Sequence, residues 1–176
     1  MTQGSPDDLL DGLVAGDDSA YEALYDAYGA ALLRAATAIL GAQGDAEDAV
    51  QDVFVAIVRA GERLRGVRNL RAYLFASLRR AALRRHPGRG PVALVRCDVP
   101  AAAAPTGTDA DTSARLERAL AALPRDQREV LALHVDGGLT FEECGRALAI
   151  SPNTAASRYR YALEKLRDAL SAATRE

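Results

Sequence analysis

The chain has 176 residues, 49% of them hydrophobic, and a formal net charge of −2. This length suits one domain or two small ones. No apolar run approaches the length of a membrane span, and the polar, acidic N-terminus does not match a signal peptide. We therefore expect a folded protein of the cytoplasm.

Charge is distributed unevenly along the chain. Residues 1–58 hold eleven acidic residues and one arginine, whereas residues 59–90 hold ten arginines and a single acid, Glu62. Such a step predicts a surface in the middle third that binds a polyanion. The acidic first third would then face a different, basic partner.

Helical patterns fill the first half of the chain, and no segment has a convincing strand pattern. The expected helices cover residues 5–15, 18–40, 45–61 and 69–86. Asp18 or Ser19 would cap the second helix and Gly41 would stop it. The third helix has acids near its start, where the helix dipole favours them.

Residues 87–111 differ in composition, since they hold four of the seven prolines and an alanine run. This composition predicts a flexible linker. Two further helices are expected at 112–123 and 124–136. The predicted fold class is therefore all-α, with two small helical domains, 5–86 and 112–172, joined by the linker.

The end of the chain has the pattern of a helix-turn-helix. Thr140 and Glu143 have capping-box spacing, which satisfies free backbone donors at a helix start. After a tight turn, Ser151 would cap the next helix and Pro152 would occupy its first position. In this motif the start of the second helix enters the DNA major groove.

The second helix of this motif has an apolar and a polar face. The polar side chains include types that pair with base edges or phosphates. They are Asn153, Thr154, Ser157, Arg158, Arg160 and Tyr161. A solvated face of an amphipathic helix is the alternative explanation. The tight turn and the two caps favour DNA binding.

Cysteine and histidine usage argues against metal or catalytic chemistry. Cys97 and Cys144 lack the spacing of metal ligands, and Cys144 is expected to be a small buried thiol. His86 and His134 have no partner at motif spacing, and no phosphate-cradling loop is present. We expect no enzyme activity, no cofactor and no metal.

Two segments resemble conserved regions of bacterial sigma factors. The segment DAEDAVQDVFVAIVRA, followed by LRGVRNLRAYLFASLRRAALRR, resembles their second region. The segment LPRDQREVLALHVDGGLTFEECGRALAISPNTAASRYRYALEKLRDAL resembles their fourth region. The missing third region, the short length and the linker match the extracytoplasmic-function (ECF) group of the sigma-70 family.

The resemblance covers about residues 5–86 and 112–170 and implies a promoter-specificity subunit of RNA polymerase. It implies that the second region binds the polymerase clamp and opens the −10 element. It also implies that the fourth region reads the −35 element and docks on the polymerase flap. An anti-sigma factor is the further partner that it implies.

The resemblance assigns polymerase contacts to the third helix, at Asp45, Glu47, Asp48, Gln51, Asp52 and Phe54. A solvated acidic helix start is the alternative. It assigns contacts with the −10 element to nine residues of the following loop and helix: Arg63, Arg65, Arg68, Asn69, Arg71, Tyr73, Arg79, Arg80 and Arg84. Arginines can follow phosphates, and an aromatic face or a pocket can hold an unstacked base. For Tyr73, contact with a base and packing in the core are equally plausible roles, whereas packing in the core is the expected role of Phe75.

Several positions depart from the family pattern. Val58 stands where Trp is usual, and Ala56 where Arg is usual. Ala156 replaces a common basic residue, which leaves the −35 sequence open. Ala149 stands where the turn usually has Gly, so a positive φ there would be strained.

The alternative function is a stand-alone or degenerate sigma-like regulator that binds DNA but does not initiate transcription. Such a protein would keep the helix-turn-helix and lose the clamp-binding face. The presence of DAEDAVQDVF argues against it.

Overall fold

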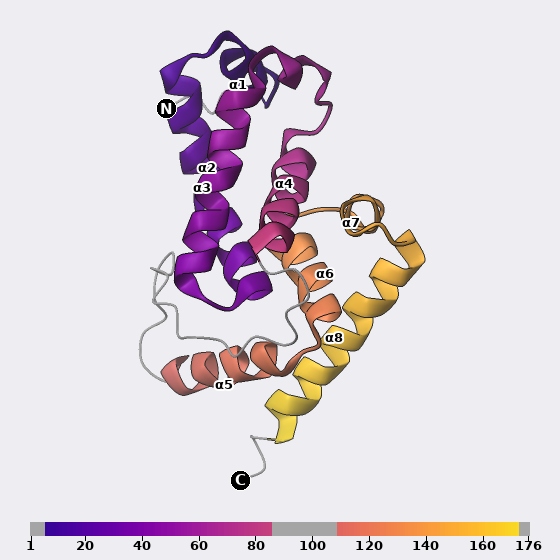
Figure 1. Cartoon of the computed structure of the whole chain (residues 1–176). Helices are drawn as coiled ribbons and strands as arrows, with labels where there is room; N and C mark the ends of the chain where they lie inside the picture. The colour runs from indigo at the N-terminus through magenta and orange to yellow at the C-terminus, as the bar shows by residue number, and fades with distance from the viewer. Residues whose placement is uncertain (1–5, 86–108, 173–176) are drawn as a thin grey trace.

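The computed structural model describes residues 6–85 and 109–172, and across these ranges its regular elements are all helices (Figure 1). The all-α prediction is therefore confirmed. The elements are α1 (Pro6–Ala15), α2 (Asp18–Leu40), α3 (Gln43–Ala60), the 3₁₀ helix η1 (Gly61–Gly66), α4 (Leu70–Arg85), α5 (Asp109–Ala122), α6 (Arg125–Val135), α7 (Phe141–Leu148) and α8 (Pro152–Ala172).

The start of α2 differs from the prediction in its cap. The side chain of Asp17, not of Asp18 or Ser19, caps the helix by accepting a hydrogen bond from the backbone N–H of Ser19 at 3.0 Å. Gly41 ends the helix in the left-handed region, with φ of 79°, as predicted. Glycine adopts that conformation at no steric cost.

The segment between α3 and α4 was expected to be a loop and is instead the 3₁₀ helix η1. Its Leu64 is fully buried and anchors the turn in the core. Asn69 precedes α4 as a cap, because its Oδ1 accepts a hydrogen bond from the N–H of Ala72 at 2.9 Å. α4 therefore begins one residue after the expected start.

The helix-turn-helix caps are present as predicted. Thr140 and Glu143 form the capping box, with hydrogen bonds of 3.2 and 2.8 Å in the two directions. Ser151 Oγ accepts a hydrogen bond from the N–H of Thr154 at 3.0 Å. Ala149 has a φ of +56°, so the strained conformation considered for this position is present.

The hydrophobic core of the first domain continues into the second. One cluster joins buried residues of α1 to α4, such as Leu24 and Leu74, to Leu133 of α6 and Leu148 of α7. α4 packs on α2 and α3 of the first domain and on α7 of the second, while α6 packs directly on α2 (Figure 1). A smaller cluster joins α5 to α8. The two domains therefore pack directly on each other, which the sequence did not predict.

Other core predictions are confirmed. Phe75 is 1% exposed, and Cys144 is fully buried, where desolvation raises the pKa of its thiol to about 11. Ala155, Ala162 and Leu166 form the buried face of α8. Cys97, His86 and most of the expected linker lie outside the described residues, and residues 109–111 of that linker belong to α5.

Within residues 6–85 and 109–172, none of the helices combines the length and the apolar character that crossing a membrane requires.

Candidate polymerase and nucleic-acid interfaces

Two of the predicted polymerase-contacting acids on α3 are engaged inside the domain. Arg85 in the last turn of α4 donates to the carboxylates of Asp48 at 3.0 Å and Asp52 at 2.9 Å. Arg85 also donates to the backbone oxygen of Asp48 at 3.2 Å. These acids therefore tie α3 to α4, while Asp45 is half-buried.

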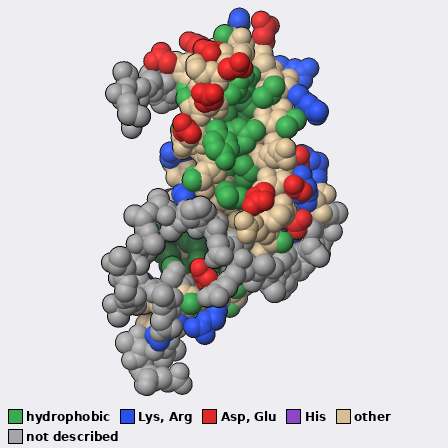
Figure 2. Space-filling view, turned by 90° about the vertical axis from the view of Figure 1, so that its left-hand side faces the viewer, with side chains coloured by type: hydrophobic (Ala, Val, Ile, Leu, Met, Phe, Trp, Pro, Cys, Tyr) green, Lys and Arg blue, Asp and Glu red, His purple; other side chains and the backbone are tan. Residues whose placement is uncertain are grey.

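The remaining predicted residues of α3 form an outward surface, which we call the outer face of α3. Glu47 and Gln51 are exposed, and Phe54 is half-buried with its ring centroid 5.4 Å from that of Tyr25 of α2. Tyr25 is 62% exposed and Val58 57% exposed. Figure 2 shows hydrophobic side chains gathered over α2 and α3, with acidic side chains at the edge. Such a surface suits a protein partner with apolar and basic groups.

A groove of about 500 Å³ lies between α3, η1 and α4, and we call it the α3–α4 groove. It is lined by Asp52, Val55, Ala56, Arg59, Ala60, Arg63, Tyr73 and Arg84. The guanidinium of Arg80 lies 6.0 Å from the centre of the Tyr73 ring. An aromatic ring among arginines is the combination that binds single-stranded nucleic acid. Arg59 was missed from the sequence, although it lies one helical turn before Arg63.

The predicted −10 residues do not form one surface. Arg63, Tyr73 and Arg84 line the α3–α4 groove, and Arg80 lies beside it. Arg65 and Arg68 are exposed on and after η1. The other three, Asn69, Arg71 and Arg79, share a different side of α4 with the buried Phe75. That side, which we call the inner face of α4, meets the second domain.

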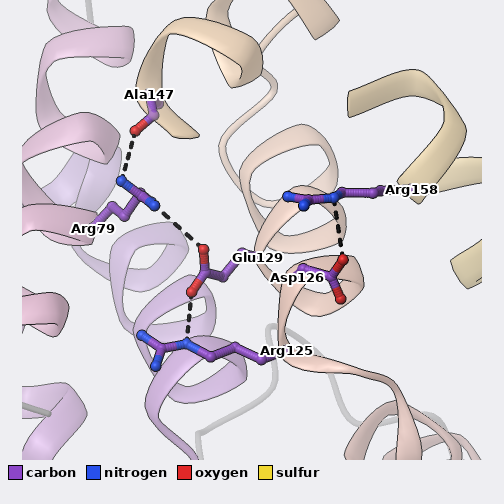
Figure 3. Close-up of polar contacts among 6 residues, drawn as sticks. All are labelled: Arg79, Arg125, Asp126, Glu129, Ala147 and Arg158. Carbon is purple, nitrogen blue, oxygen red and sulfur yellow. Dashed lines mark hydrogen bonds and ion pairs between the residues drawn. The ribbon is translucent and has the colours of Figure 1, made fainter. Parts of the chain in front are cut away.

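The inner face of α4 makes polar contacts with the helix-turn-helix. Asn69 Nδ2 donates to Glu143 Oε1 at 2.5 Å. Arg79 Nη1 donates to the backbone oxygen of Ala147 at 3.1 Å, and its Nε lies 3.5 Å from Glu129 Oε2 of α6 (Figure 3). These contacts were not foreseen, because local sequence does not report which helices meet.

The predicted −35 residues lie together on the first half of α8. Asn153 and Thr154 are exposed at its start, and Ser157 is half-buried. Arg160 is exposed, with its guanidinium 5.5 Å from the ring centre of Tyr161, which is itself 50% exposed. The arrangement presents hydroxyl, amide, cationic and aromatic groups on consecutive turns.

His134 has a packing role in the second domain. Its ring stacks on Phe141 at 4.4 Å and meets Tyr159 edge-on at 4.7 Å. Its Nδ1 lies 2.7 Å from the backbone oxygen of Leu139. Across the part of the chain that the structure describes, no group of three or more His, Cys, Asp or Glu side chains is placed to hold a metal ion.

Comparison with known proteins explains the two domains. Residues 24–90 match the family Sigma-70 region 2, and residues 113–166 match Sigma-70, region 4. The chain is 34% identical over 140 residues to the ECF RNA polymerase sigma factor ShbA of Streptomyces griseus. This alignment covers 69% of each chain. It is 35% identical over 130 residues to the RNA polymerase sigma factor CarQ of Myxococcus xanthus, covering 71% of this chain and 74% of that one.

Solved structures share the arrangement of helices. CnrH, in complex with the cytosolic domain of CnrY, superposes with a TM-score of 0.68 at 26% identity, covering 93% of this chain and 96% of CnrH. The sigma factor RpoE of Bartonella quintana, in complex with the anti-sigma factor NepR, has a TM-score of 0.61 at 24% identity, covering 80% of this chain and 90% of RpoE. The second likeness concerns the fold alone.

A region 2 domain followed by a region 4 domain defines a transcription initiation factor of the sigma-70 type. The chain belongs to the ECF group of RNA polymerase sigma factors, whose members are promoter-specificity subunits of RNA polymerase.

Proposed function

We propose that three separate exposed surfaces divide the work of promoter recognition in this chain. The observation that carries the proposal is their different chemistry. The outer face of α3 is apolar with acids, the α3–α4 groove is basic with a tyrosine, and the first half of α8 carries groups that read bases. Each surface suits one of the contacts that a sigma factor must make.

The outer face of α3 is proposed to bind the polymerase clamp. Glu47, Gln51 and Phe54 are the contacting residues of the predicted set, and Tyr25 and Val58 extend the surface. Asp48 and Asp52 act as positioning residues, since their carboxylates hold Arg85. Asp45, the last of the six residues predicted to contact polymerase, is half-buried and is kept in the proposed set. Charge complementarity with a basic partner speeds association and fixes its orientation.

The α3–α4 groove is proposed to hold the opened −10 strand. Arg63, Arg80 and Arg84 would neutralise phosphates, and the Tyr73 ring would stack on an unstacked base. Binding energy to the single strand offsets the few kcal/mol of unstacking, so melting needs no nucleotide hydrolysis. Arg65 and Arg68 would extend the phosphate path along η1.

The first half of α8 is proposed to enter the major groove of the −35 element. Asn153 and Thr154 lie at the helix start, where helix-turn-helix proteins contact base edges. Ser157, Arg158 and Arg160 follow toward the phosphates. Tyr161 lies beside Arg160 and would add an aromatic contact to the same surface.

The proposal also covers the bounds of the two domains, the place where the chain acts and its regulatory partner. We assign the region 2 domain to residues 5–86 and the region 4 domain to residues 112–172; α5, which begins at Asp109, leads into the latter. The chain works in the cytoplasm with RNA polymerase as a regulator, without a catalytic reaction of its own. The complex of CnrH with the cytosolic domain of CnrY supports a regulatory partner, such as an anti-sigma factor, for this chain too.

Reconstitution with bacterial core RNA polymerase tests the division of labour. Purified chain and core would be assayed for co-elution, for binding to a −35 duplex and for run-off transcription from a genomic promoter library. Glu47→Arg with Gln51→Ala should abolish co-elution and spare −35 binding. Arg84→Ala should spare co-elution and −35 binding but lower the amount of run-off transcript.

Glu117→Arg is the matched control for the charge reversal, because Glu117 is exposed on α5, away from the three surfaces. It should retain all three activities. Loss of −35 binding together with co-elution in the α3 variant would contradict the division. DNA binding without any association with core would favour the alternative, a stand-alone or degenerate regulator.

A further inference from the structure

The α3–α4 groove contains an acid, which is unexpected in a surface proposed to bind phosphates. Among the described residues that line the groove, Asp52 is the one carboxylate, beside the guanidinium groups of Arg59, Arg63 and Arg84. The Asp52 side chain is 41% exposed, so a ligand in the groove would meet its charge. A carboxylate at this place would repel a phosphate and compete with it for the nearest arginine. Strand binding in the groove therefore requires that another cation neutralise Asp52.

Arg85, in the last turn of α4, is placed to neutralise this acid. Its Nη2 donates to Asp52 Oδ2 at 2.9 Å. Its Nη1 donates to Asp48 Oδ2 at 3.0 Å, and its Nη2 also donates to the backbone oxygen of Asp48 at 3.2 Å. Asp48 and Asp52 lie one helical turn apart on α3, so one planar guanidinium can bind both of them. Arg85 belongs to none of the residue sets that sequence analysis predicted.

Arg84, the preceding residue, contacts the same oxygen of Asp52 much less closely. Its Nη2 lies 3.9 Å from Asp52 Oδ2. The Arg84 side chain is 66% exposed, whereas that of Arg85 is 27% exposed and is fixed by three hydrogen bonds. An exposed ion pair of this length contributes little. Arg84 is therefore available to a ligand in the groove, and Arg85 is not.

We propose that Arg85 is a positioning residue for binding of the −10 strand. It neutralises Asp52 and thereby keeps Arg84 free to bind a phosphate of the opened strand. The inference rests on the proposed function, because it takes the α3–α4 groove as the strand-binding site. Without the charge of Arg85, the carboxylate of Asp52 would pair closely with Arg84 and would also repel the strand. Arg85 acts in this way without touching DNA.

A purely structural role for Arg85 predicts a different result. Arg85 ties α3 to α4, and loss of such a tie would lower the stability of the first domain. A second substitution at Asp52 would then leave strand binding weak, because nothing replaces the tie. Under the proposal, the second substitution removes the charge that captures Arg84, and strand binding recovers.

Strand binding by the holoenzyme separates the two roles. The chain would be combined with core RNA polymerase at a saturating concentration, so that altered affinity for the clamp does not enter the result. The probe is a short fluorescein-labelled single strand that carries a −10 element recovered from the run-off library. Fluorescence anisotropy over a range of salt concentrations gives its affinity, and a labelled −35 duplex is measured in parallel.

Two substitutions of Arg85 isolate its charge. Arg85→Gln keeps an N–H donor and removes the charge, and it should weaken strand binding by about three- to tenfold. The slope of log affinity against log salt should become shallower by about 0.7, the value for one phosphate contact with a single strand. Arg85→Lys keeps the charge and should stay within about threefold of the parent chain. Neither variant should change binding of the −35 duplex.

Arg85→Gln combined with Asp52→Asn is the deciding variant. It should restore strand affinity to within about twofold of the parent chain, together with the salt slope. Arg85→Gln combined with Asp48→Asn is the matched control, because Asp48 also binds Arg85 but does not line the groove. It should bind the strand as weakly as Arg85→Gln alone. Recovery in neither double variant, or equal recovery in both, would overturn the proposal.

If circular dichroism shows that Arg85→Gln does not fold, Asp52→Asn alone decides. It should tighten strand binding by up to about threefold, because the acid no longer competes for Arg84 or repels phosphates. Weaker strand binding by this variant would show that Asp52 assists the strand, contrary to the proposal.

Failure of the underlying function is recognised through Arg84→Ala. Unchanged strand binding by that variant would mean that the groove does not hold the −10 strand, and both the proposed function of the groove and the role of Arg85 would be wrong. Weaker binding by Arg84→Ala, without recovery when Asp52→Asn is added to Arg85→Gln, would overturn the role of Arg85 alone.

Discussion

Arg158 of α8 and Asp126 of α6 form an ion pair, with Nε 3.1 Å from Oδ2, that joins the recognition helix to the helix behind it (Figure 3). The side chain of Arg158 is 31% exposed and lies at the proposed DNA surface. The pair therefore restrains a side chain that the −35 element would have to engage.

The first prediction concerns these two residues. Arg158→Ala should weaken −35 duplex binding by about 1–3 kcal/mol if the guanidinium reaches a base edge. Asp126→Asn should tighten binding by up to about fivefold, because it releases Arg158 and removes an acid near DNA. Fluorescence anisotropy with a labelled duplex at fixed salt measures both. Weaker binding by Asp126→Asn would show instead that the pair positions Arg158 for DNA.

The turn of the helix-turn-helix gives the second prediction. Ala149 has a φ of +56°, which is costly for a residue with a Cβ. Ala149→Gly should raise the free energy of unfolding by about 0.5–1 kcal/mol, since relief of strain exceeds the added flexibility of the unfolded chain. Urea unfolding followed by circular dichroism measures the free energy of unfolding. A lower value for the variant would contradict the claim that Ala149 is strained.

The third prediction compares two glycines. A Cβ at Gly145 would lie 2.8 Å from the backbone oxygen of Ile150 and 3.2 Å from the nitrogen of Pro152. Gly145→Ala should therefore lower the free energy of unfolding by about 2–4 kcal/mol, because backbone atoms cannot move aside cheaply.

Gly44→Ala is the matched control, since Gly44 lies in α3 with no atom within 4 Å of the added Cβ. It should raise the free energy of unfolding by about 0.5–1 kcal/mol, through better helix propensity. Similar stability of the two variants in urea would mean that the close approach of the α7 and α8 backbones is not required.

The fourth prediction concerns pH. Burial raises the pKa of the Asp136 carboxyl, and the hydrogen bond and charge of Arg34 offset only part of this effect. The native chain then binds this proton more tightly than the unfolded chain. The resulting stabilisation is fully present below the unfolded pKa near 4 and is lost as pH rises through the raised native pKa.

Asp136→Asn lacks this titration. Urea unfolding of both chains from about pH 3.5 to 7 should show the parent chain losing stability relative to the variant as pH rises. A relative gain by the parent chain would mean that the 3.0 Å pair with Arg34 outweighs burial.

The features that sequence analysis predicted correctly are local. The capping box of Thr140 and Glu143, the cap at Ser151 and the stop at Gly41 depend on residues within a few positions of each other. Cys144 was placed in the core by its position on an apolar helix face, and core packing was the favoured role for Phe75. Local hydrogen bonds and helical periodicity decide these features before the domains meet.

The features that were missed depend on contacts between distant residues. Helical spacing could put Arg79 on a basic side of α4, but not reveal that Glu129 and Ala147 meet it there. The same holds for Arg85, whose partners Asp48 and Asp52 were expected to face a protein partner. η1 was missed because Leu64 folds back only when a core is present to receive it.

The shared core of the two domains limits how freely they can be exchanged between relatives. A chimera that joins the first domain of this chain to the second domain of another family member would carry Asn69 and Arg79 without assurance of Glu143 and Glu129 opposite them. Such a hybrid would also bring together two halves of the shared core that come from different proteins. Exchange of the second domain therefore requires rebuilding the face of α4 on which it packs.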